Sequence, residues 1–91
     1  MTPPSSPVVR LRPGSVEWRE VEGEVIAVDV RTSEYLAINP TGAVLWRTLQ
    51  GGATRSGLAE RLVATFDVEP DAAARDVGEF LAALEARGLL E

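Results

Sequence analysis

The sequence predicts an α+β domain, in which a three-stranded antiparallel sheet precedes three helices. Apolar residues alternate with polar ones over residues 16–38, which is the period of half-buried strands. From residue 40 onward they recur at spacings of three and four, the period of amphipathic helices. Strands that come first and helices that follow favour an α+β architecture, and a chain of 91 residues forms one small domain.

The first residues precede the expected domain. Residues 1–7 contain three Pro and two Ser without an apolar period, which predicts a disordered tail ahead of a domain over 8–91. The segment from Val8 to Arg12 is either a short strand or an extended lead-in, and it ends at the turn dipeptide Pro13-Gly14.

Three alternating runs form the expected sheet. Gly23 separates the first two runs, and Arg31-Thr32-Ser33 separates the last two, so both connections suit hairpins. Asp29 is expected on the face of the middle strand opposite to its apolar set. The apolar residues that share a face within each run are Val16 and Trp18, then Ile26, Val28 and Val30, and then Leu36 and Ile38.

The expected helices have recognisable ends. Asn39-Pro40 predicts the start of a helix that runs to about Gln50, because Asn is a favoured N-cap and Pro suits the first helical position. Thr54 is expected to cap the second helix, Pro70 to lie near the start of the third, and Arg87-Gly88 to end it. The apolar stripes are Leu45, Trp46 and Leu49, then Leu58, Leu62 and Phe66, and then Val77, Phe80, Leu81 and Leu84.

The composition excludes several kinds of chemistry. The chain has no Cys, His or Lys, and therefore no disulfide, thiolate nucleophile, imidazole base, Cys/His zinc site or Schiff-base lysine. Ser15, Ser33 and Ser56 accordingly have no His partner for nucleophilic catalysis. Because no apolar run has signal-peptide or membrane length, the expected location is the cytoplasm.

Other candidate residues are explained more simply by a structural role than by a catalytic or ligand-binding one. Carboxylates can act in acid–base catalysis or bind a hard cation. In this chain we favour the interpretation that the candidate carboxylates lie on solvent-exposed faces. The candidates are Asp29, Glu34, Asp71 and Asp76. Gly51-Gly52 is read as a helix breaker rather than a phosphate loop, because no Lys is present. Trp46 is expected in the core, and Trp18 either in the core or in an exposed contact.

A helix-turn-helix reading of the last two helices would suggest DNA binding. The net charge is −5, and the third expected helix carries Asp71, Asp76, Glu79 and Glu85 against Arg75 and Arg87. Phosphate contacts need basic side chains, so nucleic acid is not an expected partner.

An exposed strand edge needs no reactive side chain. An extended peptide adds to such an edge through main-chain hydrogen bonds, and neighbouring pockets select its side chains. The last strand, Glu34 to Ile38, is the candidate edge, and the third helix beside it would complete a groove. The alternative is an edge that is merely covered or blunted.

Several runs in this chain carry a family resemblance together. They are Tyr35 to Trp46 (YLAINPTGAVLW), Leu58 to Leu62 (LAERL), Phe66-Asp67-Val68, Asp76 to Leu84, and Gly88-Leu89-Leu90. In this order they resemble the PqqD-like family of leader-recognition elements for ribosomally made, post-translationally modified peptides (RiPPs). The resemblance implies a winged helix-turn-helix-like fold that binds a precursor's leader as a further strand, beside the third strand and against the third helix. It implies no catalytic residue, metal or cofactor.

Carried over to this sequence, the resemblance implies a peptide-binding set on the third strand and third helix. Its members are Glu34, Tyr35, Leu36, Ala37, Ile38, Arg75, Asp76, Val77, Phe80, Ala83, Leu84 and Arg87. The two Arg would pair with leader acids and the helix acids with leader lysines, while Val77 and Leu84 also belong to the expected core.

The discrete leader-binding proteins of lasso peptide pathways are the most similar branch. That similarity implies a precursor whose leader carries a Tyr-x-x-Pro motif, a separate leader peptidase and a lasso cyclase as partners, with no membrane partner. The quinone-cofactor branch, in which a small PqqD protein serves a radical enzyme as a peptide chaperone, is the alternative.

Overall fold

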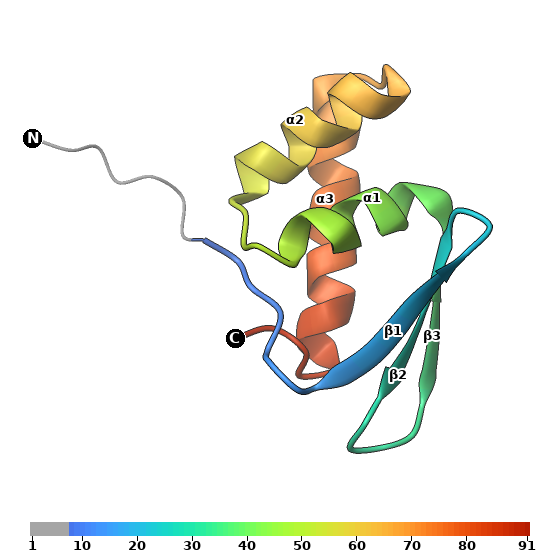
Figure 1. The fold of residues 1–91 in the computed structure, drawn as a ribbon. Helices are drawn as coiled ribbons and strands as arrows, with labels where there is room; N and C mark the ends of the chain where they lie inside the picture. Colours follow the sequence, from blue (N-terminus) through green and yellow to red (C-terminus); the bar gives the residue numbers. More distant parts are fainter. Residues whose placement is uncertain (1–7) are drawn as a thin grey trace, which may run out of the picture.

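Three strands and then three helices follow one another along residues 8–91, the part of the chain that this computed structural model describes (Figure 1). The elements are β1 (Val16–Val21), β2 (Glu24–Asp29), β3 (Tyr35–Ile38), α1 (Pro40–Leu49), α2 (Arg55–Phe66) and α3 (Pro70–Ala86). The expected α+β order is confirmed. The tail expected over residues 1–7 lies outside the described residues.

The sheet is an antiparallel meander. Its order is β1-β2-β3, so β1 and β3 are both edge strands. Glu22 and Gly23 connect β1 to β2 with φ of 54° and 85°, as a two-residue type I′ hairpin turn requires. A longer loop, residues 30–34, leads from β2 to β3.

The middle strand presents to the core the face opposite to the one expected. The residues turned inward are Val25, Ala27 and Asp29, whereas Ile26 and Val28 lie half-buried on the outer face and Val30 is exposed. This strand has apolar residues on both faces, so alternation alone does not decide which face is buried. The prediction of a solvated Asp29 is also wrong, because its side chain is buried and accepts a hydrogen bond from the N–H of Arg31 at 2.9 Å.

The expected helix starts are confirmed by their caps. Asn39 Oδ1 accepts from the N–H of Gly42 at 2.8 Å, and Thr54 Oγ1 accepts from the N–H of Gly57 at 3.0 Å, so each side chain satisfies a main-chain donor that the helix leaves unpaired. The end of α3 is also as expected: the helix stops at Ala86, and Arg87 and then Gly88, with a φ of 73°, follow it.

Phe66 departs from the expected stripe of α2. It is the last residue of the helix and is 39% exposed. The chain turns there through Asp67, which adopts the left-handed conformation, so the Phe66 side chain lies beyond the reach of the core. The buried residues of α2 are Leu58 and Leu62.

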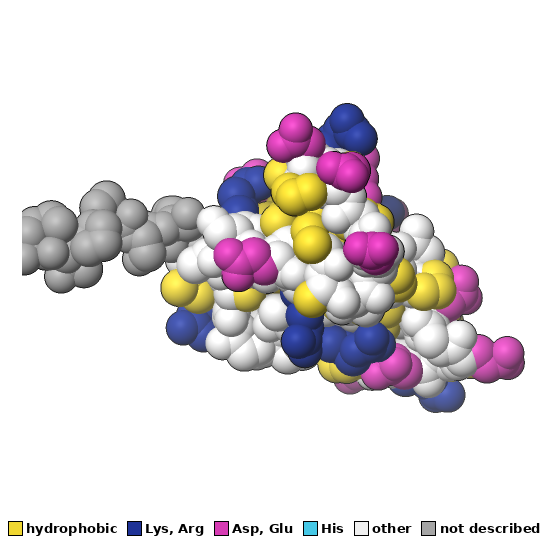
Figure 2. All heavy atoms as spheres, turned by 90° about the horizontal axis from the view of Figure 1, so that it is seen from above, with side chains coloured by type: hydrophobic (Ala, Val, Ile, Leu, Met, Phe, Trp, Pro, Cys, Tyr) yellow, Lys and Arg dark blue, Asp and Glu magenta, His cyan; other side chains and the backbone are white. Residues whose placement is uncertain are grey.

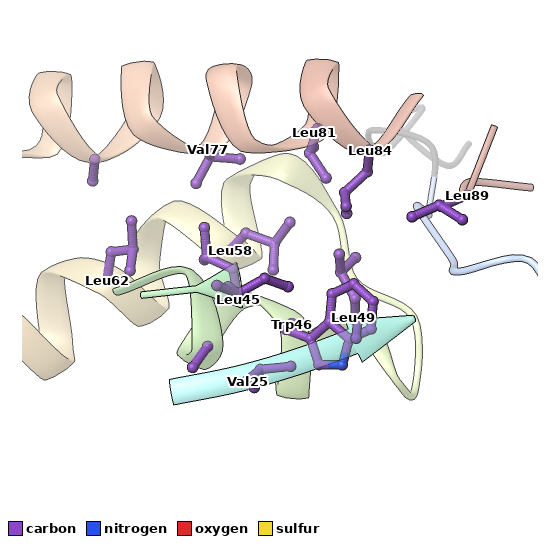
Figure 3. Packing of buried hydrophobic residues seen from close by; sticks show 14 residues of the cluster. Val25, Leu45, Trp46, Leu49, Leu58, Leu62, Val77, Leu81, Leu84 and Leu89 are labelled. Carbon is purple, nitrogen blue, oxygen red and sulfur yellow. The ribbon is translucent and has the colours of Figure 1, made fainter. Parts of the chain in front are cut away.

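The three helices and β2 share one hydrophobic core (Figure 3). From α3, Val77, Leu81 and Leu84 point toward side chains of the other elements, among them Leu45, Trp46, Leu49, Leu58 and Leu62. Trp46 is fully buried, as expected, and the ring of Trp18 meets it edge-on with centroids 6.0 Å apart. Trp18 is 37% exposed, so it combines core packing with a surface position.

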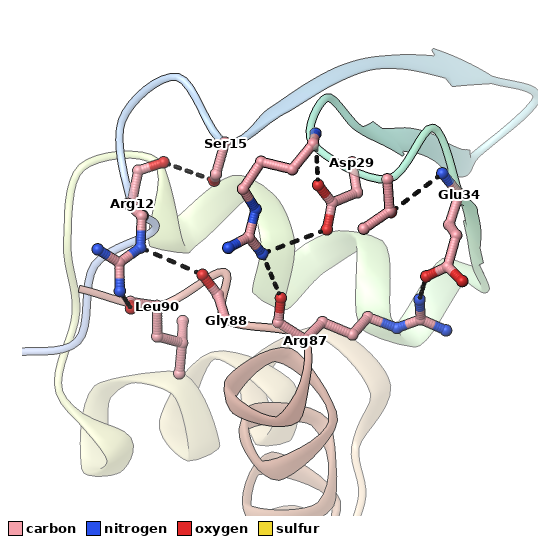
Figure 4. Close-up of polar contacts among 9 residues, drawn as sticks. Arg12, Ser15, Asp29, Glu34, Arg87, Gly88 and Leu90 are labelled. Atoms are coloured by element: carbon pink, nitrogen blue, oxygen red, sulfur yellow. Dashed lines mark hydrogen bonds and ion pairs between the residues drawn. The ribbon is translucent and has the colours of Figure 1, made fainter.

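The lead-in and the last residues of the chain hold each other. Single bridges join Val9 to Ala53 and Leu11 to Leu90, so the lead-in is extended and pairs without forming a full strand. Arg12 donates to the carbonyls of Gly88 and Leu90 at 3.2 and 3.1 Å (Figure 4). These contacts hold the turn after α3 in place, and Leu89, which follows that turn, is completely buried.

Candidate functional site

The outer side of β3 is an open main-chain edge. The Glu34 carbonyl accepts from the N–H of Asp29 at 2.9 Å, and in an antiparallel ladder such pairs alternate along the strand. Leu36 and Ile38 therefore turn their main-chain groups toward β2, while Tyr35 and Ala37 turn theirs away from the sheet. Each of these outward residues offers one N–H and one C=O to another strand.

The helix α3 forms the second wall of a groove along this edge. A hollow of about 280 Å³ lies between β3, the start of α1 and the last turns of α3. Its lining is Leu36, Ala37, Ile38, Asn39, Gly42, Phe80, Ala83, Leu84 and Arg87. Because most of these side chains are apolar, the hollow suits the apolar side chain of a bound segment.

A second hollow of about 390 Å³ continues the first past the start of α1. Its lining is Asn39, Thr41, Gly42, Leu45, Asp76, Glu79 and Phe80, of which Asn39, Gly42 and Phe80 also line the first. A Cβ at Gly42 would lie 2.7 Å from Ile38 Cγ2 and 3.3 Å from Phe80 Cε1. The missing side chain therefore leaves room at the junction of the two hollows.

Two side chains hold the β2–β3 loop to the C-terminal end of α3 (Figure 4). The Arg31 guanidinium donates to the Arg87 carbonyl at 2.8 Å, and the Arg87 guanidinium pairs with the Glu34 carboxylate at 3.3 Å. Both contacts cross from the loop that precedes β3 to the helix that faces it. They join the loop to the helix at one end of the groove.

Asp29 in turn holds Arg31. The N–H of Arg31 donates to one carboxylate oxygen of Asp29 at 2.9 Å, and the Arg31 guanidinium lies 3.5 Å from the other. The N–H donor first, and then the guanidinium, hold the pKa of Asp29 below its ordinary value, although burial acts in the opposite direction. Asp29 is therefore charged in the folded state, and its carboxylate positions Arg31.

The structure brings most of the predicted peptide-binding residues to this groove. Those that line the first hollow are Leu36, Ala37, Ile38, Phe80, Ala83, Leu84 and Arg87. Asp76 lines the second hollow, and Glu34 lies at the end of the groove through its pair with Arg87. Ile38 and Leu84 are also buried in the core.

Three predicted residues lie elsewhere. Val77 is buried in the core, and Arg75 is exposed and lines neither hollow of the groove. The side chain of Tyr35 is 74% exposed and faces the outer side of the sheet, although its main-chain groups lie at the open edge. A wider hollow of about 550 Å³ lies there, lined by Tyr35 and residues of β1 and β2.

Sequence reasoning missed five groove residues, which are Asn39, Thr41, Gly42, Leu45 and Glu79. The first three belong to the start of α1, and Asn39 was recognised only as a cap. Their place beside α3 depends on how α1 packs against β3, which local sequence patterns do not give. Glu79 was recognised as an acid of the third helix, and its spacing of three residues from Asp76 was the signal that both share a face.

The surface charge of the described residues is mixed. In the view of Figure 2, acidic and basic side chains lie side by side, with apolar side chains between them, and that face shows no continuous basic stripe. In residues 8–91, no helix is long and apolar enough to cross a membrane. The same residues bring together no cluster of three acidic side chains that would hold a metal ion.

Comparisons with known proteins give a family and two similar structures. The family model described as "Coenzyme PQQ synthesis protein D (PqqD)" matches residues 24–90. A structure described as "TbiB1 in Complex with the TbiA(beta) Leader Peptide" aligns with a TM-score of 0.82 and 24% identity, over 90% of this chain and 94% of that one. A structure described as "Lasso peptide synthetase B1 complexed with the leader peptide" aligns with a TM-score of 0.79 and 26% identity, over 91% and 96%. A search of curated proteins found no match.

Proposed function

This chain belongs to the PqqD family, and from that premise we propose that it is a RiPP recognition element that binds the leader segment of a precursor peptide in lasso peptide biosynthesis. The observation that carries the proposal is the open edge of β3 beside an apolar groove walled by α3. The leader adds as a fourth strand next to β3, and its inward side chains enter the groove.

Two kinds of interaction supply the affinity. Tyr35 and Ala37 exchange main-chain hydrogen bonds with the leader, each contributing about 0.5–1.5 kcal/mol. An apolar leader side chain buried against Phe80 and Ala83 adds about 1.5–3 kcal/mol. Micromolar binding corresponds to about 8 kcal/mol, so further leader side chains must be buried along the groove to offset the cost of ordering the leader.

The two similar structures support this assignment, because both are described as complexes with a leader peptide. One of them is described as a lasso peptide synthetase component. The groove lies along the edge that strand addition would use. The residues proposed to contact the leader are those named from the sequence, apart from the buried Val77 and from Arg75, with Asn39, Thr41, Gly42, Leu45 and Glu79 added from the lining.

The role proposed for the protein is presentation rather than catalysis. A chain without Cys, His or Lys holds the leader while a separate leader peptidase, and then a lasso cyclase, act on the precursor. Tethering the substrate raises its effective concentration at those enzymes. We place this activity in the cytoplasm, where the precursor is synthesised.

The test is a titration with the leader of the precursor encoded beside this protein, including a Tyr-x-x-Pro segment where that leader has one. Isothermal titration calorimetry should give a Kd in the micromolar range or below, and a scrambled leader of the same composition should not bind. Absence of binding by the natural leader would refute the proposal.

The family description supports a second candidate, a peptide chaperone for a radical enzyme in quinone cofactor biosynthesis. The two candidates require different neighbours. An adjacent transglutaminase-like peptidase and an asparagine-synthetase-like cyclase would support the lasso role, whereas an adjacent radical enzyme would support the second.

A further inference from the structure

One end of the groove is acidic. Asp76 and Glu79 line the hollow beside the start of α1, both are exposed, and no ion pair within residues 8–91 includes either of them. Arg75 precedes them on α3 but lines neither hollow. A peptide that passes this end therefore meets two carboxylates that form no ion pair with these residues.

The other end presents a guanidinium. Arg87 lines the hollow beside β3, and its contact with Glu34 is 3.3 Å long and exposed on both sides. An exposed pair of this kind contributes little, and guanidinium has further N–H donors. A peptide carboxylate can therefore join or replace Glu34. Arg31 donates to the Arg87 carbonyl but is itself paired with the buried Asp29, so the guanidinium available to a peptide at this end is that of Arg87.

The spacing of these ends fits a short extended segment. Glu79 and Arg87 are eight positions apart on and just after α3, about 12 Å along a helix axis. An extended strand covers that distance in about four residues. Because side chains of a strand alternate between its two faces, residues four positions apart, and the one midway, point to the same face.

The direction of the segment follows from the sheet. All pairings in this sheet are antiparallel, and antiparallel pairs are the more stable per residue. β3 runs from Tyr35, near Arg87, to Ile38, near Gly42 and the acidic end. An antiparallel fourth strand therefore enters at the acidic end and leaves at the guanidinium.

We infer that the groove selects an extended peptide segment in which a basic residue is followed two positions later by an apolar residue and four positions later by an acidic one. This inference rests on the proposed function and adds the charge order of the ligand. The basic residue meets Asp76 and Glu79, the apolar residue packs on Phe80 and Ala83, and the acidic residue meets Arg87.

Two synthetic peptides of identical composition test the order. One contains Lys-Ala-Leu-Ala-Glu and the other Glu-Ala-Leu-Ala-Lys, in the same flanking sequence, and the natural leader is titrated alongside them. At low salt the first peptide should bind about three- to tenfold more tightly, and the ratio should fall toward one at 1 M salt, where the Debye length is about 3 Å. Equal affinity, the reverse preference, or failure of both peptides while the natural leader binds would overturn the charge order. Failure of the natural leader would instead overturn the proposed function.

A charge-reversed variant tests whether Asp76 and Glu79 cause this preference. Asp76→Arg with Glu79→Arg should invert the preference between the two peptides. The matched control, Asp71→Arg with Glu85→Arg, changes the net charge equally at exposed positions of α3 that line neither hollow, and it should keep the original preference. Inversion by both double variants would mean that overall charge, and not the groove, decides the order.

Discussion

The two edges of the sheet offer the same main-chain groups but have different surroundings. On β1, the N–H of Val30 donates to the Ser15 carbonyl, so by alternation Trp18 and Glu20 turn their main-chain groups outward. The hollow that β1 residues help to line is the larger, about 550 Å³, but it lies over the outer face of the sheet, and residues of the three strands alone line it. Beside β3 the hollow is about 280 Å³, and α3 forms its second wall. A helix beside a strand edge makes that edge selective for a peptide, whereas a large hollow alone does not, because the helix places pockets beside the main-chain hydrogen bonds.

Proline substitution distinguishes the two edges most strongly. Ala37→Pro removes an outward N–H of β3 and adds a ring at the edge, while the bonds of β3 to β2 remain. We expect leader binding to fall about hundredfold, because a lost main-chain bond that leaves the leader carbonyl unpaired costs about 1–3 kcal/mol and the ring adds a clash. Calorimetry measures the Kd, and circular dichroism checks the fold.

The matched substitution at the other edge is Glu20→Pro, which removes an outward N–H of β1. It also removes the exposed pair of Glu20 with Arg47, at a cost of about 0–1 kcal/mol of folding free energy. Leader affinity should stay within twofold of wild type. If Glu20→Pro weakened binding as much as Ala37→Pro, the leader would not add at β3 alone.

The two phenylalanines give the next largest difference. Phe80 lines both hollows of the groove, so Phe80→Ala should weaken leader binding about tenfold through loss of apolar contact. Phe66 lies at the end of α2 and lines neither hollow, so Phe66→Ala should leave the Kd unchanged. Equal effects of the two substitutions on Kd would move the binding site away from the groove.

A smaller effect comes from the glycine at the junction of the hollows. In Gly42→Ala the new Cβ would lie 2.7 Å from Ile38 and 3.3 Å from Phe80, so the groove narrows and the fold loses about 1–3 kcal/mol through overpacking. Leader binding should weaken about threefold. The control is Gly78→Ala in α3, where no atom lies within 4 Å of the new Cβ; stability should rise by up to about 1 kcal/mol and binding should not change. Unaltered binding by Gly42→Ala would show that the leader does not pass the junction.

Much of this fold follows from local patterns, and the site follows from them only in part. The change of period at Asn39-Pro40 and the cap at Thr54 locate helices because their causes lie within a few residues. The burial of Asp29 was missed because β2 is apolar on both faces and because Arg31, which satisfies the carboxylate, turns back only in the folded loop. The edge at β3 was recognised from alternation. Gly42 was not recognised as a groove residue, since its role depends on contacts with α3 across the groove.

The smallest effect on binding, and the sharpest dependence on pH, is expected at Asp29. Its lowered pKa, caused first by the N–H of Arg31, means that the charged carboxylate stabilises the folded state above the unfolded pKa of about 3.9. That contribution disappears as the pH falls through the folded pKa. Urea denaturation should therefore find Asp29→Asn less stable than wild type at pH 7 and closer to it near pH 3. Leader affinity at pH 7 should change by less than about twofold, since Arg31 keeps its bond to the Arg87 carbonyl.

The control is Glu24→Gln, which changes an exposed carboxyl on the same strand. It should leave the free energy of unfolding within about 0.5 kcal/mol of wild type at pH 7. A gap between wild type and Asp29→Asn that stayed constant from pH 7 to pH 3 would mean that packing, and not the ionised carboxylate, holds the loop at the end of the groove.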